Sequence, residues 1–156
     1  MVQSGKQDYS EDARGLKLAV VAARYNEHIV GQLLEGARRR WVELGGEPGS
    51  LRIERVPGAF ELPLAARQFA HGKSVDAVVA LGCVIRGDTA HFDFVAGECA
   101  RGVQQVMLDT GLPVSFGVLT TDTEAQAHER ASPDAMNKGA EAVDTAVQMA
   151  RLLRRI

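Results

Sequence analysis

Residues 77–102 read AVVALGCVIRGDTAHFDFVAGECARG, and this stretch decides the predicted fold class. Its first part, 77–85, is almost wholly apolar, which is typical of a strand buried on both faces of a sheet. A cluster of charge and glycine at 86–89 follows, and apolar residues then recur at helical spacing from Phe92 to Met107. A buried strand that ends in polar residues just before a helix indicates a βα unit of a parallel sheet.

On either side of this stretch, the same alternation of strands and helices repeats. The sequence predicts strands at residues 16–24, 51–56, 75–85 and 112–120. It predicts helices at residues 28–45, 61–72, 92–107, 122–131 and from about 137 to the end. Strands that alternate with helices favour right-handed crossovers and a helical layer on each face of the sheet. The predicted fold class is therefore α/β, a three-layer α/β/α sandwich with a four-stranded parallel sheet.

The length and composition fit one soluble globular domain. The chain has 156 residues, of which 46% are hydrophobic and 24% charged, enough for a real core. The polar start predicts a flexible N-terminal arm at 1–15, followed by a single domain at 16–156. A net charge of -2 gives no electrostatic footprint for nucleic acid, and no apolar run reaches the length of a membrane helix. Because the arm lacks the apolar middle of a signal peptide, we expect a cytoplasmic protein.

The cysteines and histidines suggest neither a disulfide nor a metal site. Cys83 and Cys99 both lie inside apolar patterns, which favours free, buried thiols. The four histidines show none of the spacings typical of zinc sites; they are His28, His71, His91 and His128. The sequence therefore predicts no metal ion.

Polar and glycine residues are sparse inside the predicted strands and dense just after them. The segments that follow the strands read RYNEH, PGAFE, RGDTAH and TTDTE. Because the carboxyl ends of parallel strands meet at one edge of the sheet, these segments are expected to lie together. Ligands bind at that edge in open α/β sheets. The sequence therefore predicts a ligand pocket at this edge.

The segment RGDT has the features of an anion site at the start of a helix. Gly87 allows backbone N–H groups to approach a ligand, and free N–H groups at a helix N-terminus favour phosphate. Asp88 or Thr89 can also simply cap the helix, which is the alternative. At His91 the positive end of the helix dipole disfavours imidazolium, and a neutral ring can accept a proton and return it in a later step. The adjacent phenylalanines predict a partly buried ring; an ordinary surface histidine is the alternative.

The segment VPGAFELP predicts a turn that can hold a planar polar heterocycle. After the turn at 57–58, Ala59 and Phe60 present backbone groups and an aromatic ring, and Glu61 begins a helix. A plain connection with Phe60 in the core is an equal alternative. Tyr25, at the end of the first strand, offers a second stacking surface, or is a half-buried loop tyrosine.

Four motifs in order resemble the lumazine synthase family, from about residue 16 to the last helix. They are VPGAFELP, ALGCVIRGDTAHFDFV, GVLTTDTEAQAHER and NKGAEAV. The resemblance implies a flavodoxin-like fold and condensation of 5-amino-6-(ribitylamino)uracil with 3,4-dihydroxy-2-butanone 4-phosphate. The products would be 6,7-dimethyl-8-ribityllumazine, phosphate and water, in the penultimate step of riboflavin biosynthesis. No metal or redox cofactor is implied.

The resemblance also assigns roles to residues of this chain. It makes His91 the proton shuttle. The residues that it assigns to the phosphate of the butanone are Gly87, Asp88, Thr89, Arg130 and Lys138. Those that it assigns to the pyrimidine and ribityl chain are Tyr25, Ala59, Phe60, Glu61, Cys83, Val84, Ile85 and Phe116. Arg130, Lys138 and Phe116 would come from a neighbouring subunit; by pattern alone, the two cations are solvated charges.

The resemblance further implies a homopentamer with active sites between subunits. Pentamers of the family stay single, pair into decamers or build sixty-subunit shells, and riboflavin synthase is an expected partner. The segment ASPDAMN at 131–137 has the short length seen in shell-forming relatives but lacks their glycine-rich sequence. Assembly beyond the pentamer therefore stays open.

Two other functions compete with this prediction. A flavodoxin-like carrier of flavin mononucleotide would need a Ser/Thr-rich phosphate loop after the first strand, where this chain reads ARYNEH. A non-catalytic paralogue could bind riboflavin or lumazine, or serve as a scaffold. The intact His91, Arg130 and Lys138 argue against the paralogue.

Overall fold

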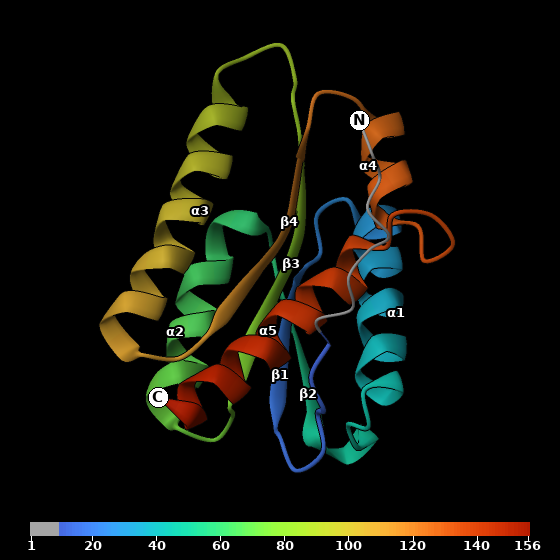
Figure 1. Ribbon diagram of the computed structural model, residues 1–156. Helices are drawn as coiled ribbons and strands as arrows, with labels where there is room; N and C mark the ends of the chain where they lie inside the picture. Colours follow the sequence, from blue (N-terminus) through green and yellow to red (C-terminus); the bar gives the residue numbers. More distant parts are fainter. Residues whose placement is uncertain (1–9) are drawn as a thin grey trace, which may run out of the picture.

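The computed structural model describes residues 10–156 and consists of one sheet between two helical layers (Figure 1). The strands are β1 (Leu18–Ala23), β2 (Leu51–Val56), β3 (Ala77–Ile85) and β4 (Val114–Thr121). The helices are α1 (Glu27–Glu43), α2 (Leu62–Gly72), α3 (His91–Thr110), α4 (Glu124–Ala131) and α5 (Lys138–Arg155), with short 3-10 turns η1 (Pro48–Ser50) and η2 (Ala59–Glu61). Every predicted strand and helix is confirmed, with ends shifted by at most three residues. None of these helices, within 10–156, is long and apolar enough to cross a membrane.

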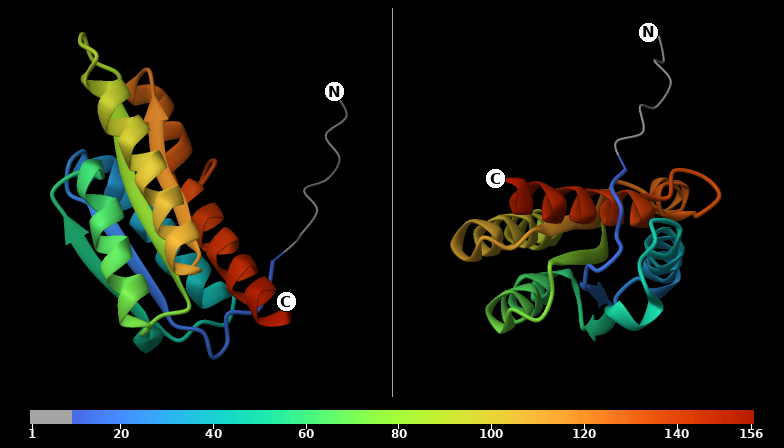
Figure 2. Two further views of the ribbon diagram at one scale, coloured as in Figure 1. Left: turned by 90° about the vertical axis from the view of Figure 1, so that its left-hand side faces the viewer. Right: turned by 60° about the horizontal axis from the view of Figure 1, so that its bottom comes forward.

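The sheet is parallel throughout, with strand order β2-β1-β3-β4. Leu18 pairs with Leu51 of β2 and with Ala77 of β3, and Val78 pairs with Val114 of β4. One apolar core joins the sheet to α1, α4 and α5, and a second joins its other face to α2 and α3 (Figure 2). Because both faces are covered, the central strands are buried along almost their whole length, which explains their unbroken apolar runs. The predicted three-layer sandwich is confirmed.

Close packing between α1 and α5 fixes where the last helix begins. Gly139 lies against the backbone of Leu33, and a side chain at this position would collide with the Leu33 carbonyl. Asn137 precedes the helix in a left-handed conformation, and its side-chain oxygen accepts a hydrogen bond of 3.3 Å from the amide of Ala140. These two contacts set the position of Lys138, the first residue of α5.

The N-terminal segment is described only from residue 10 onward, so residues 1–9 of the predicted arm lie outside the described residues. From Asp12 to Arg14 the chain lies against α5. Arg151 donates hydrogen bonds of 2.8 and 2.7 Å to the carbonyl oxygens of Asp12 and Arg14. Between them, Ala13 is fully buried, and its amide donates to the carbonyl of Leu44 over 2.9 Å.

Candidate active site

The segments that follow β1, β2 and β3 meet in one cavity of about 770 Å³, the strand-end pocket. Ten predicted site residues line it: Tyr25, Ala59, Phe60, Glu61, Cys83, Val84, Ile85, Gly87, Thr89 and His91. Asp88 belongs to the same loop but is not among the lining residues. The expected pocket at the carboxyl ends of the strands is thus present.

Backbone and side-chain hydrogen bonds tie these segments together. The amides of Arg24 and Tyr25 donate to the carbonyls of Val56 and Pro57, over 2.8 and 3.1 Å, so the loops after β1 and β2 run side by side. Asn26 adopts a left-handed conformation with φ 60°, and its side-chain amide donates to the carbonyl of Cys83 over 2.9 Å. The ends of three adjacent strands are therefore held in one frame around the pocket.

The rim of the strand-end pocket is aromatic and open to solvent. The exposed fractions are 72% for Tyr25, 60% for Phe60 and 68% for Phe94. Two alternatives from the sequence are therefore wrong, because Phe60 does not enter the core and Tyr25 is not half-buried. Exposed aromatic rings gathered on one rim favour a bound ligand or a protein surface that covers them.

Part of the wall of the strand-end pocket was not predictable from the loops alone. Phe94 and Val95 line the cavity together with His91. Residues three and four apart on a helix share one face, so the helical pattern from His91 contained this signal.

Arg86 lies in the loop between β3 and α3 and connects it to neighbouring segments. Its Nε donates to Asp122 Oδ1 over 2.9 Å, its Nη1 lies 3.5 Å from Asp93 Oδ1, and its guanidinium carbon lies 4.3 Å from the ring centroid of Phe92. The hydrogen bond to Asp122 raises the pKa of Arg86 further. Arg86 therefore ties this loop to the loop after β4, and its charge is already balanced by two carboxylates.

Helix α3 begins without a side-chain cap from its N-cap residue, Ala90. Thr89 Oγ1 accepts a 3.3 Å hydrogen bond from the amide of His91, whereas Asp88 provides no cap. This hydrogen bond stabilises a local turn before the helix. The positive end of the helix dipole lies next to the loop that contains Gly87. Such a start is suited to an anionic group.

His91 is the first residue of α3 and is exposed, so the expectation of partial burial is wrong for the single chain. Figure 1 shows the physical reason: α3 extends well past α2, the helix beside it. The first turn of α3 therefore projects beyond the end of α2. The imidazole lies at the mouth of the strand-end pocket, where a bound molecule can reach it.

Both cysteines are free and buried, as predicted. Burial raises the pKa of Cys83 to about 11, with a smaller contribution from the charge of Glu124. Burial alone raises the pKa of Cys99 to about 11. Because a neutral thiol is a poor nucleophile, Cys83 contributes an apolar wall to the pocket and no covalent chemistry.

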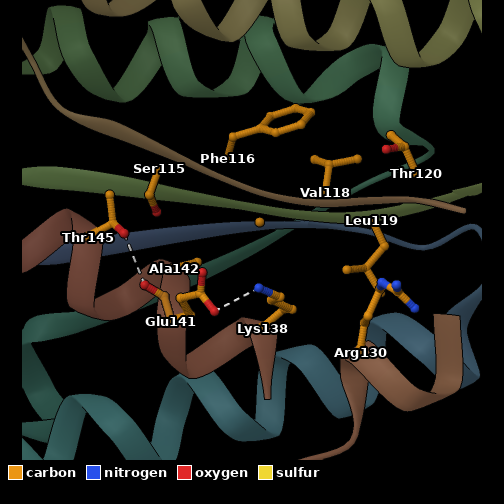
Figure 3. Close-up of a pocket in the computed structure, with 11 residues that line it drawn as sticks. Ser115, Phe116, Val118, Leu119, Thr120, Arg130, Lys138, Glu141, Ala142 and Thr145 are labelled. Atoms are coloured by element: carbon orange, nitrogen blue, oxygen red, sulfur yellow. Dashed lines mark hydrogen bonds and ion pairs between the residues drawn. The ribbon is translucent and has the colours of Figure 1, made fainter. Parts of the chain in front are cut away.

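A second cavity of about 460 Å³, the β4 pocket, contains the remaining predicted residues (Figure 3). It is lined by residues 115–120 of β4 and by Arg130, Lys138, Glu141, Ala142 and Thr145. Consecutive residues of a strand point to opposite faces, so a pocket lined by all of them runs along the edge of the sheet. β4 is an edge strand, and Phe116 on it is 43% exposed.

Two cationic side chains point into the β4 pocket from the same side of the strand (Figure 3). Arg130 Nη1 donates to the carbonyl of Gln126 over 3.1 Å, and its nearest ion-pair partner, Glu129, is 3.9 Å away. Lys138 Nζ pairs with Glu141 over 2.9 Å. A capping box between Thr123 and Gln126 fixes the start of α4. It therefore also helps to fix the position of Arg130, which lies one helical turn after Gln126.

The predicted site residues therefore divide between two cavities of one chain. Ten of them, including His91, line the strand-end pocket, whereas Phe116, Arg130 and Lys138 line the β4 pocket. One chain alone does not bring the two cations into the cavity of the imidazole.

Comparisons with known proteins place the chain in a family. A family model described as 6,7-dimethyl-8-ribityllumazine synthase matches residues 15–154. Proteins of that name from two strains of Thermus thermophilus are each 54% identical to this chain over 144 residues, 92% of either chain. One from Syntrophus aciditrophicus is 47% identical over 144 residues, covering 92% of this chain and 94% of its own. The chain belongs to the 6,7-dimethyl-8-ribityllumazine synthase family.

Proposed function

We propose that the chain condenses 5-amino-6-(ribitylamino)uracil with 3,4-dihydroxy-2-butanone 4-phosphate. The products are 6,7-dimethyl-8-ribityllumazine, phosphate and water, in the penultimate step of riboflavin biosynthesis. The observation that carries this proposal is the strand-end pocket, where an aromatic rim, a glycine-containing loop at a helix start and an accessible imidazole line one cavity. These are the groups that a planar pyrimidine, a phosphate and a series of proton transfers require.

In this proposal the pyrimidine ring stacks against the exposed aromatic rim. Tyr25 and Phe60 offer the ring faces, and offset stacking adds about 0.5–1.5 kcal/mol beyond the area buried. Backbone groups of Ala59 and the carboxylate of Glu61 bind the polar edge and the ribityl chain. Cys83, Val84 and Ile85 form the apolar floor below the ring.

His91 transfers protons in the successive steps of the proposed reaction. It accepts a proton as the amine attacks the ketone and returns that proton as water leaves. It then removes a proton from the carbon next to the imine and returns it as phosphate leaves. The same ring assists the closure that completes the second heterocycle. An imidazole suits these tasks because its two protonation states are both accessible near neutral pH.

The phosphate is bound by groups of two subunits. Gly87, Asp88 and Thr89 come from the chain that provides His91, and Arg130 and Lys138 come from a neighbour. Two observations support this arrangement. Both cations lie along the open edge of the sheet, and no lysine or arginine is among the residues that line the strand-end pocket. Phe116 would close the pyrimidine site from the neighbour's side.

The assembly that follows is a homopentamer, with five composite sites between neighbours. Whether pentamers stay single, pair or form sixty-subunit shells is to be read from light scattering on the purified protein. We place the protein in the cytoplasm and expect riboflavin synthase, which consumes the product, as a partner.

The direct test supplies both substrates to the purified chain and follows the absorbance of the lumazine. Product formation that requires both substrates supports the proposal. A protein that binds riboflavin or lumazine without forming product would instead be the non-catalytic paralogue. Colour in the purified protein reveals a retained flavin in either case.

Mixing two impaired variants, assayed at a butanone phosphate concentration well below the raised KM of Arg130→Ala, tests the shared site. His91→Ala and Arg130→Ala chains are dissociated, mixed and reassembled. With random mixing, about one interface in four carries both native residues, so about a quarter of the wild-type rate should return. If both residues acted within one chain, mixing would restore nothing beyond the sum of the two variants.

A further inference from the structure

Three metal-binding side chains from two helices gather outside both pockets. His28 lies in the first turn of α1, and Glu124 and His128 lie one turn apart on α4. One ligand atom of each residue lies within 4.8 Å of the other two. None of the three is among the lining residues of the strand-end pocket or the β4 pocket.

The distances fit a small, borderline-soft cation. Glu124 Oε1 is 2.6 Å from His28 Nε2 and 3.6 Å from His128 Nε2, and the two imidazole centroids are 5.4 Å apart. A tetrahedral zinc ion with bonds of 2.0–2.2 Å sets its ligand atoms about 3.3–3.6 Å apart. The separation between Glu124 and His128 lies at the upper end of this range, whereas the separation between Glu124 and His28 is shorter. Metal binding therefore requires the exposed side chains of His28 and Glu124 to move apart.

The backbone that bears these ligands is well fixed. Buried Ile29 of α1 and buried Ala127 and Ala131 of α4 belong to the same core, and Figure 1 shows α4 beside the start of α1. The capping box of Thr123 and Gln126 holds the first turn of α4. Little ordering is therefore required when a ligand binds.

The two imidazoles reach the same carboxylate oxygen from different helices. His128 lies four residues after Glu124, so helix geometry alone brings that pair together. His28 belongs to α1, so only the packing of α1 against α4 adds the third side chain.

We propose that His28, Glu124 and His128 form a binding site for one divalent transition-metal ion of the zinc class. Two imidazole nitrogens and one carboxylate oxygen are the ligands, and the fourth position faces solvent. Imidazole donors favour zinc, nickel or copper ions over magnesium or calcium, which prefer oxygen ligands. The site is independent of the condensation reaction and does not rest on the proposed function.

The test titrates the untagged full-length chain with Zn²⁺ by calorimetry and with Co²⁺ by visible absorption. We expect one ion per chain and the intense d–d bands of four-coordinate Co²⁺. His28→Ala and His128→Ala should each weaken Zn²⁺ binding at least about tenfold. The matched control is His71→Ala, because His71 is an exposed histidine on α2 that is not in the cluster.

Thermal unfolding separates loss of the site from loss of the fold. Zn²⁺ should raise the Tm of the wild-type chain and of His71→Ala, and leave the Tm of the double variant His28→Ala/His128→Ala unchanged. Equal affinity in the double variant and the wild type would overturn the proposal, as would one ion shared by two chains. No substrate is present in these titrations, so their failure is distinguishable from failure of the proposed reaction.

Discussion

The strand-end pocket and the β4 pocket differ in origin and in chemistry. The first collects loops after three strands, and its exposed aromatic rim surrounds an imidazole. The second follows the open edge of one strand and contains two cationic side chains. In the proposed mechanism, proton transfer and ring binding are therefore separated within the chain from the two cations that bind phosphate. Substitutions in the two pockets should therefore change different kinetic constants.

The largest expected effect is that of His91→Ala. Removal of a general acid–base should lower kcat by about 10²–10⁴-fold, without abolishing turnover, since the pocket still positions both substrates. Steady-state kinetics with either substrate varied gives the value, and His71→Ala is the control. A kcat equal to that of wild type would show that His91 does not transfer protons in the rate-limiting step.

Next in size is Arg130→Ala, in the other pocket. A charge-assisted hydrogen bond to phosphate contributes about 1.5–3 kcal/mol, so the KM for the butanone phosphate should rise about ten- to a hundredfold. The KM for the pyrimidine should change little. Arg101→Ala is a matched control, because Arg101 is an exposed arginine of α3 that lines neither pocket. An unchanged KM for the butanone would contradict the shared phosphate site.

Tyr25→Ala should have a smaller effect, confined to the pyrimidine. Loss of one stacking face, about 0.5–1.5 kcal/mol, predicts a KM for the pyrimidine that rises about two- to twelvefold. Tyr25→Phe keeps the ring and should behave as wild type. If Tyr25→Phe were as impaired as Tyr25→Ala, the hydroxyl rather than the ring face would be the binding group.

The smallest effect is expected for Cys83→Ala. The raised pKa of about 11 keeps this thiol protonated throughout the neutral range, so deprotonation contributes nothing to the rate there. The pH profile of kcat should therefore match that of the wild type. Cys99→Ala, which removes the other buried thiol, is the control. A profile that lost an ionisation in Cys83→Ala alone would assign the thiol a catalytic role.

Periodicity in the sequence was sufficient to predict the layers, the parallel sheet and the edge at which the loops converge. Local turn chemistry was sufficient to predict the candidate site residues in the loops after the strands, whereas Cys83, Val84 and Ile85 followed only from the family resemblance. The exposure of His91 was not predictable, because it depends on how far α3 extends past α2. The hydrogen bond between Arg86 and Asp122 was also not predictable, since Asp122 follows a different strand.

The cluster of His28, Glu124 and His128 shows the same limit more clearly. The sequence predicted no metal, because zinc-type spacings were sought along one segment. In the proposed site, Glu124 and His128 lie almost a hundred positions beyond His28, and only the packing of α4 against α1 brings the three side chains together. Side-chain encounters between distant helices leave no periodic trace in the sequence.

The hydrogen bonds from Arg151 to the backbone of Asp12 and Arg14 join two segments that lie far apart in the sequence. Removal of Arg151 would release residues 12–14 from α5 and loosen the packing around Ala13, which is fully buried. A nascent chain can therefore complete this corner of its core only after residue 151 has been synthesised.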